Sequence, residues 1–187
     1  MKQGRMCLIA AALLLAAVGA ETSWAHQAPG SYTMGVVGGG YFFEGEQNVD
    51  NAPFFGMSAS HQFTEHWAVE GLLTYATVQT NYFDTTEGVC KTNTDIDAYY
   101  FKADGLYFFS TYGKVVPYFS AGVGGLWLRD DKGVQDEAQS LMNWGAGLKY
   151  LLGPQLAFRA ELRHVHTFQD SNDNATLTGF LTWEFMP

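Results

Sequence analysis

The segment "LRHVHT" (162–167) holds two histidines two residues apart. An imidazole can serve as a general base or as a metal ligand. A strand would put His164 and His166 on one face, together with Leu162, because side chains alternate along a strand. Zinc would need a third ligand that the sequence does not identify, and the one hydroxyl nearby, on Thr167, has the opposite parity. We therefore expect neither a catalytic residue nor a metal site here.

The opposite face of the same segment carries charges. Glu161 lies between Arg159 and Arg163, a spacing that could also provide an acid/base couple. The same parity in other segments holds four acidic and four basic residues, namely Glu70, Lys102, Asp104, Lys149, Arg159, Glu161, Arg163 and Glu184. Charges in a narrow interior must be paired to offset their desolvation, whereas a solvated face needs no such balance. The balance favours a structural charge network in a lumen.

The elements that carry these residues are predicted to be strands. The chain contains runs of residues that are rich in aromatics and interrupted by glycines. Apolar and polar residues alternate along these runs, without the 3.6-residue periodicity of an amphipathic helix. Most are long enough to match the roughly 9–11 residues of a strand that crosses an outer membrane. The eight runs are Tyr32–Phe43, Phe54–Phe63, Trp67–Tyr82, Ala98–Phe109, Val116–Leu128, Leu141–Leu152, Leu156–Phe168 and Ala175–Phe185.

The connections between these runs alternate in length. Three are short: 64–66, 110–114 and 153–155. Longer ones, at 44–52, 83–97, 129–139 and 169–174, together hold thirteen acidic residues against Lys91, Arg129 and Lys132. Short turns at one end and longer loops at the other are typical of an up-and-down barrel in the bacterial outer membrane.

The parity opposite to the charges is apolar and aromatic. We expect Trp67 and Trp183 near the periplasmic end and Trp127 and Trp144 near the outer end, as two aromatic girdles. The reversed arrangement would aim four Lys or Arg side chains at lipid, at about 2–4 kcal/mol each. The predicted fold is therefore all-β: an eight-stranded antiparallel up-and-down transmembrane β-barrel. On its outer wall, His164 and His166 are expected to be interfacial.

The N-terminus reads as an export signal. Basic residues precede an apolar run, and small residues follow, so 1–25 is predicted to be a signal peptide and 26–187 the barrel domain. No later run offers about 18 consecutive apolar residues. Removal of Lys2, Arg5 and Glu21 from the chain's 10 basic and 19 acidic residues leaves 8 and 18, a net charge of −10. That charge argues against a nucleic-acid partner.

Three segments, "SHQFTEHWAVEGLLTY" (60–75), "VPYFSAGVGGLW" (116–127) and "NWGAGLKYLLGPQLAFRAELRH" (143–164), resemble the membrane domain of OmpA-like outer-membrane proteins. The resemblance implies a monomeric barrel in the outer membrane, with a charged network instead of an open pore. Matching network positions are Glu70, Lys149, Arg159, Glu161 and Arg163. We expect the membrane domain only, without a periplasmic peptidoglycan-binding domain. Expected partners are outer-membrane lipid, lipopolysaccharide and the barrel-assembly machinery.

Three different functions stay open beside a structural or surface-interacting barrel without a cofactor. The first is a lipid A-modifying enzyme, because the stretch "RHVHT" (163–167) resembles the His-x-Ser signature of the lipid A deacylases. His166 stands where that signature has its serine, and an imidazole cannot replace the hydroxyl that forms an acyl-enzyme. The second is a narrow channel, and the third is a soluble secreted β-barrel carrier.

Overall fold

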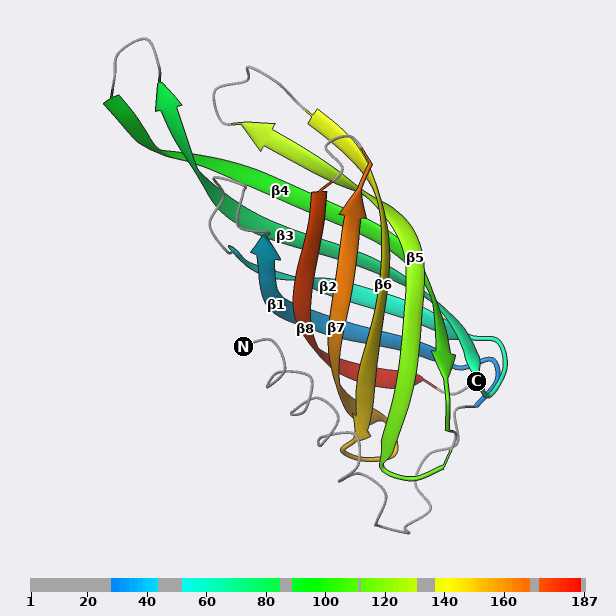
Figure 1. The fold of residues 1–187 in the computed structure, drawn as a ribbon. Coiled ribbons are helices and arrows are strands. Elements are labelled where there is room, and N and C mark those ends of the chain that lie inside the picture. The colour runs from blue at the N-terminus through cyan, green and yellow to red at the C-terminus, as the bar shows by residue number, and fades with distance from the viewer. Residues whose placement is uncertain are drawn as a thin grey trace, which may run out of the picture.

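The computed structural model of the chain describes residues 28–43, 52–84, 89–110, 112–130, 137–168 and 172–185. They form eight strands, each hydrogen-bonded to its neighbours in chain order, and β1 also pairs with β8 to close the sheet (Figure 1). The predicted eight-stranded antiparallel barrel is confirmed. The strands are β1 (Tyr32–Phe43), β2 (Ala52–Gln62), β3 (Trp67–Asp84), β4 (Val89–Phe108), β5 (Val115–Asp130), β6 (Glu137–Leu151), β7 (Leu156–Thr167) and β8 (Asn172–Phe185). None of the described residues belongs to a helix that is long and apolar enough to span a membrane.

The two ends of the barrel differ. The short connections 63–66, 109–114 and 152–155 all lie at one end, which we call the turn end. Gly113 in one of these turns has φ = 95°, a backbone conformation that favours glycine. The opposite end, the loop end, carries the connections 44–51, 85–88, 131–136 and 169–171, which lie outside the described residues.

The β3–β4 hairpin is longer than predicted. The two strands pair as far as Asp84 and Val89, with an irregularity between Thr80 and Asn81. By contrast, β2 pairs with β3 only up to Ala76, and β5 pairs with β4 only up to Ile96. The hairpin therefore extends past its neighbours and projects beyond the loop end (Figure 1).

The strand registers fix the tilt of the sheet. A row of paired residues that starts at Gly38 of β1 crosses β2 to β5 and reaches Ala138 of β6. In the other direction the row crosses β8 and β7 and reaches Leu148. The two ends lie ten residues apart on β6, because 148 minus 138 is 10. Spread over eight strands, this offset means that a row followed from β1 to β2 and onward rises toward the loop end by roughly 1.25 residues per strand. When this rise is taken into account, the residues at which the eight strands end on the turn side differ in height along the barrel axis by only about two residues.

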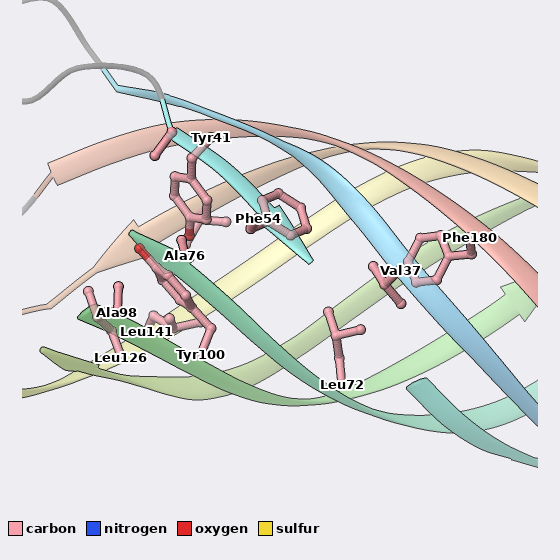
Figure 2. Packing of buried hydrophobic residues seen from close by; sticks show 12 residues of the cluster. Val37, Tyr41, Phe54, Leu72, Ala76, Ala98, Tyr100, Leu126, Leu141 and Phe180 are labelled. Carbon is pink, nitrogen blue, oxygen red and sulfur yellow. The ribbon is translucent and has the colours of Figure 1, made fainter. Parts of the chain in front are cut away.

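Alternation separates an inner from an outer face. Along β7, for example, the inward residues are buried and Phe158, Ala160 and Leu162 are exposed on the outside. Buried apolar residues form two clusters inside the barrel. The first gathers mainly at the loop end, where Tyr41, Phe54 and Tyr100 lie together (Figure 2), and the second lies at the turn end around Phe108 and Val116. Most of the inward charged residues lie between them, while Lys149 lies beside the second cluster, with its Nζ 5.8 Å from the centre of the Phe108 ring.

Candidate functional site

The central feature of the lumen is an ion pair between Arg159 of β7 and Glu70 of β3. Two guanidinium nitrogens of Arg159 donate to the two carboxylate oxygens of Glu70, at 2.5 and 3.2 Å. The guanidinium also lies over the rings of Tyr118 and Phe180, with its central carbon 4.8 and 4.2 Å from their centroids. Both charged side chains are almost fully buried. A bidentate, ring-stacked arginine is held in one orientation.

Glu161 is the most heavily hydrogen-bonded carboxylate of the lumen. It accepts bonds from the Tyr118 hydroxyl at 2.8 Å, the Ser120 hydroxyl at 2.5 Å and Arg163 Nε at 2.7 Å. Arg159 Nη2 lies 3.6 Å from Glu161 Oε2. These donors come from β5 and β7, so Glu161 joins the central ion pair to the next layer of the network.

Arg163 continues the network toward the loop end. Its Nη1 donates to Asp104 Oδ2 of β4 and to Asn143 Oδ1 of β6, the latter at 2.9 Å. Asn143 in turn donates to the second oxygen of Asp104 at 3.1 Å. Arg163 Nη2 is buried and has no hydrogen-bond partner among the described residues, and the same holds for the hydroxyl of Thr176, the residue that pairs with Arg163 on β8. The network thus spans the five strands β3 to β7 and leaves a few polar groups at its loop-end edge.

The remaining two lysines behave differently from each other. Lys149 of β6 pairs with Glu184 of β8 at 3.3 Å, and Glu184 also accepts a bond from Ser31 at 3.2 Å. Lys102 is buried, and no described carboxylate oxygen lies within 4 Å of its Nζ, which instead sits 5.9 Å from the centre of the Tyr100 ring. The structure therefore places all eight charged residues of the sequence-based network on the inner face, seven of them in direct ion pairs.

Two inward glycines make room for this network. A Cβ at Gly145 would lie 2.9 Å from Glu161 Oε1 and 3.1 Å from the Cα of Arg163. At Gly147 it would lie 2.6 Å from the hydroxyl oxygen of Tyr118. Ordinary non-bonded contacts are longer than these, so β6 can approach the network closely only because these residues have no side chain.

The outer wall holds the four predicted girdle tryptophans, all of them exposed. Relative to Gly38, the climb of the rows puts Trp67 and Trp183 roughly five residues toward the turn end and Trp127 roughly five toward the loop end. The two levels are about 25 Å apart, the usual height of the apolar band. Trp144 lies lower than Trp127, contrary to the prediction. It pairs with Ala121, far from the loop-end start of β6, and is roughly level with Gly38. Sequence alone could not reveal this, because height depends on the shear of the sheet.

His164 and His166 also lie on the outer wall, and both contact Asp173 of β8. Asp173 Oδ1 is 3.2 Å from His164 Nε2 and 2.8 Å from His166 Nδ1. Trp144 packs on His164 with ring centroids 4.3 Å apart. The sequence-based prediction includes Asp173 in the 169–174 loop and lacks this contact, although the strand that follows the 169–171 connection has to return beside β7.

Other residues of the lumen were also missed by sequence reasoning. Tyr118 and Asn143 share the inward parity of the charges, which was the available signal, but neither carries a charge. In the described part of the chain, no three His, Cys, Asp or Glu side chains form a group that could hold a metal ion.

A closed antiparallel barrel with an apolar outer wall defines the class of integral outer-membrane β-barrel proteins. The sequence matches the family described as outer membrane protein beta-barrel domain over residues 9–185, and the chain belongs to this family. Its location is accordingly the bacterial outer membrane. No curated protein matches the sequence.

Solved structures support the fold. The N-terminal barrel of Pseudomonas aeruginosa OprF matches with a TM-score of 0.58 and 22% identity, covering 84% of this chain and 98% of OprF's. Neisserial surface protein A matches with a TM-score of 0.58 and 15% identity, over 83% and 97% of the two chains. Pseudomonas aeruginosa OprG gives 0.59 and 13%, over 87% and 100%. At these identities, the likeness concerns the fold.

Proposed function

We propose that this chain is a structural or surface-interacting outer-membrane barrel whose charged lumen is largely closed, and that it acts without a catalytic site or cofactor. The observation that supports this proposal best is the cross-lumen network built on Arg159, Glu70 and Glu161. An eight-stranded barrel has an interior just wide enough for side chains to fill. Here the side chains that fill the interior form ion pairs and hydrogen bonds with one another.

The apolar clusters strengthen the case for a closed lumen. An ion that enters from the loop end first meets Tyr41 and Tyr100, whose rings stack with centroids 4.9 Å apart, together with Leu126 and Leu141. Below the charged layer it meets the second cluster around Phe108. Each passage between these apolar side chains would remove water from the ion, which is costly.

The loop end is where surface interactions would occur. The β3–β4 hairpin projects there, and the sequences of the four loop-end connections carry seven acidic residues against one lysine. This charge favours partners that are basic or that bind through divalent cations, and it keeps the surface well hydrated.

Planar-bilayer conductance tests the closed lumen. We expect the refolded wild-type barrel to show no stable conductance, and the double variant Tyr41→Ala, Tyr100→Ala to show more current, because it removes the stacked pair at the loop end. Insertion is verified by the heat-dependent gel shift of protein recovered from the bilayer lipid. A steady ohmic conductance of the wild type at the level of a water-filled pore would contradict the proposal and favour a narrow channel.

Lipid A mass spectra test the absence of catalysis. The nucleophile position of the deacylase-like signature is His166, and Thr167 is buried on the inner face. We expect identical lipid A masses in cells with and without the protein. A species lighter by one acyl chain, present only when the protein is expressed, would instead establish a lipid A-modifying enzyme.

A further inference from the structure

The outer wall of the barrel carries a cluster of ionisable side chains among mostly apolar neighbours. We call His164, His166 and Asp173 the His–Asp cluster. Its outward-facing described neighbours include Met142, Trp144 and Ser140 on β6, Phe168 beyond β7 and Ala175 on β8. Asp173 is therefore the only ionisable group among the described neighbours of the two rings. Polar groups on a lipid-facing wall are costly, so their presence needs a physical reason.

The pairing inside the cluster fixes which hydrogen-bonding atoms are left over. A carboxylate has no proton to give, so a neutral imidazole nitrogen that bonds it must carry the hydrogen. His166 therefore uses Nδ1–H on Asp173 Oδ1, and His164 Nε2 lies 3.2 Å from the same oxygen. His166 Nε2 remains as a bare acceptor, without a hydrogen-bond partner in the described part of the chain. Asp173 Oδ2 is an acceptor as well, so with neutral imidazoles these two atoms present acceptors alone.

The depth of the His–Asp cluster in the membrane further limits which part of a lipid it can contact. With the climb of the rows, His164 lies roughly 1.5 residues and His166 roughly 3.5 residues above the level of Gly38, toward the loop end. Trp127, at the expected outer boundary, lies roughly five residues above it. The cluster thus faces the outer leaflet a few ångströms below the head groups, where acyl chains begin.

We propose that the His–Asp cluster binds a hydrogen-bond donor, a hydroxyl or amide N–H, on the upper part of an acyl chain of an outer-leaflet lipid. A phosphate diester offers only acceptors and a negative charge, so it does not complement the acceptors of His166 and Asp173. The proposal deepens the expected partnership with outer-membrane lipid and relies on the non-catalytic function proposed above, since a bound chain must remain intact.

A matched lipid pair provides the test. The barrel is reconstituted into phosphatidylcholine nanodiscs that contain equal amounts of two glycerolipids with the same head group, one with a 3-hydroxymyristoyl chain and one with myristoyl. The lipids retained after mild detergent extraction at pH 8 are measured by mass spectrometry. One net hydrogen bond predicts enrichment of the hydroxylated lipid by about two- to tenfold. Because the head groups are the same, enrichment reports the acyl hydroxyl.

Variants assign the enrichment to the cluster. His164→Phe combined with His166→Phe keeps two aromatic rings on the wall and should abolish it, while Phe158→Leu, lower on the same face of β7, should leave it unchanged. A heat-dependent gel shift establishes that each variant is folded.

Equal retention of the two lipids by the wild type would overturn the proposal, and so would a preference that survives in the double histidine variant. Loss of the acyl chain from the retained lipid would overturn the non-catalytic function instead. Retention and lipid integrity are separate readouts of the same spectrum, so the two failures are distinguishable.

Discussion

Arg159 and Glu70 face each other from opposite sides of the barrel. They belong to β7 and β3, which are four strands apart in a ring of eight and share no backbone pairing. Their bidentate contact at 2.5 and 3.2 Å is therefore a strut across the whole width of the lumen. Such a strut resists flattening of the cross-section, which the hydrogen bonds between neighbouring strands do not by themselves prevent.

Neutralising Glu161 should destabilise the barrel strongly. Glu161→Gln removes the charge that Arg163 and Arg159 both approach, at 2.7 and 3.6 Å. Loss of one partner of a buried pair costs about 3–5 kcal/mol, and less where lumen water screens the charge. Urea unfolding in lipid vesicles measures the change. The matched control is Leu162→Val, the next residue and outward-facing, for which we expect a loss of about 1 kcal/mol or less. Equally small losses at both positions would mean that the lumen charges are solvated.

A methyl group at Gly147 should disturb the same network without changing any charge. In Gly147→Ala the new Cβ meets the Tyr118 ring and its hydroxyl oxygen at 2.6 Å, so Tyr118 must move away from Glu161. We expect a loss of about 1–3 kcal/mol, as for other overpacked interiors. Gly153→Ala in a turn, where a Cβ would have nothing within 4 Å, is the control and should be nearly neutral. Comparable effects of the two changes would argue against close packing around Tyr118.

Closure of the sheet should make the protein resistant to detergent. A barrel has no unpaired edge from which detergent can start to unravel it, so we expect unheated protein to migrate differently from boiled protein on a detergent gel. The shifted band should come from the membrane fraction. A single band that ignores heating would be incompatible with a closed β1–β8 seam.

The orientation of the barrel can be tested with the cysteine that remains after the predicted signal peptide. Cys90 is at the start of β4, near the tip of the projecting hairpin. A bulky, membrane-impermeant maleimide added to intact cells should label it. In a Cys90→Ser background, Tyr112→Cys in a short turn, where the tyrosine is 78% exposed, should react only after the outer membrane is opened. The reverse labelling pattern would mean that the turn end faces outward.

The number of strands and their two faces could be predicted from the sequence because both depend on local alternation. The charges of β7 and the apolar residues between them already define an inside and an outside. The ends of β3 and β4 could not be predicted in the same way. Polar residues such as Thr92 and Asn93 are as frequent in loops as in the parts of strands that extend beyond the membrane. Residue pattern alone therefore predicts a loop at 83–97, where the structure has the ends of β3 and β4.

The side-chain pairs in the lumen and the heights of residues along the barrel axis also could not be predicted from the sequence. Arg159 has Glu161 two residues away, yet its bidentate partner is Glu70, 89 residues earlier in the chain. Which inward residues meet depends on the shear of ten residues, a property of closure that no single strand records. For the same reason Trp144 could not be placed at its height, and Asp173 could not be assigned to the two histidines.

The cross-lumen strut has a consequence for the order of assembly. Glu70 is synthesised and threaded with the third strand, but the guanidinium that neutralises it arrives only with the seventh. A sheet that stops after six strands would carry Glu70 and Asp104 without the two arginines of β7, and Lys149 without Glu184 of β8. Such an intermediate gains little from entering lipid, because these charges lack their ion-pair partners and its edges are open. Arrival of β7 and β8 supplies the partners and closes the seam together, so we expect insertion and completion to be coupled in a single late step.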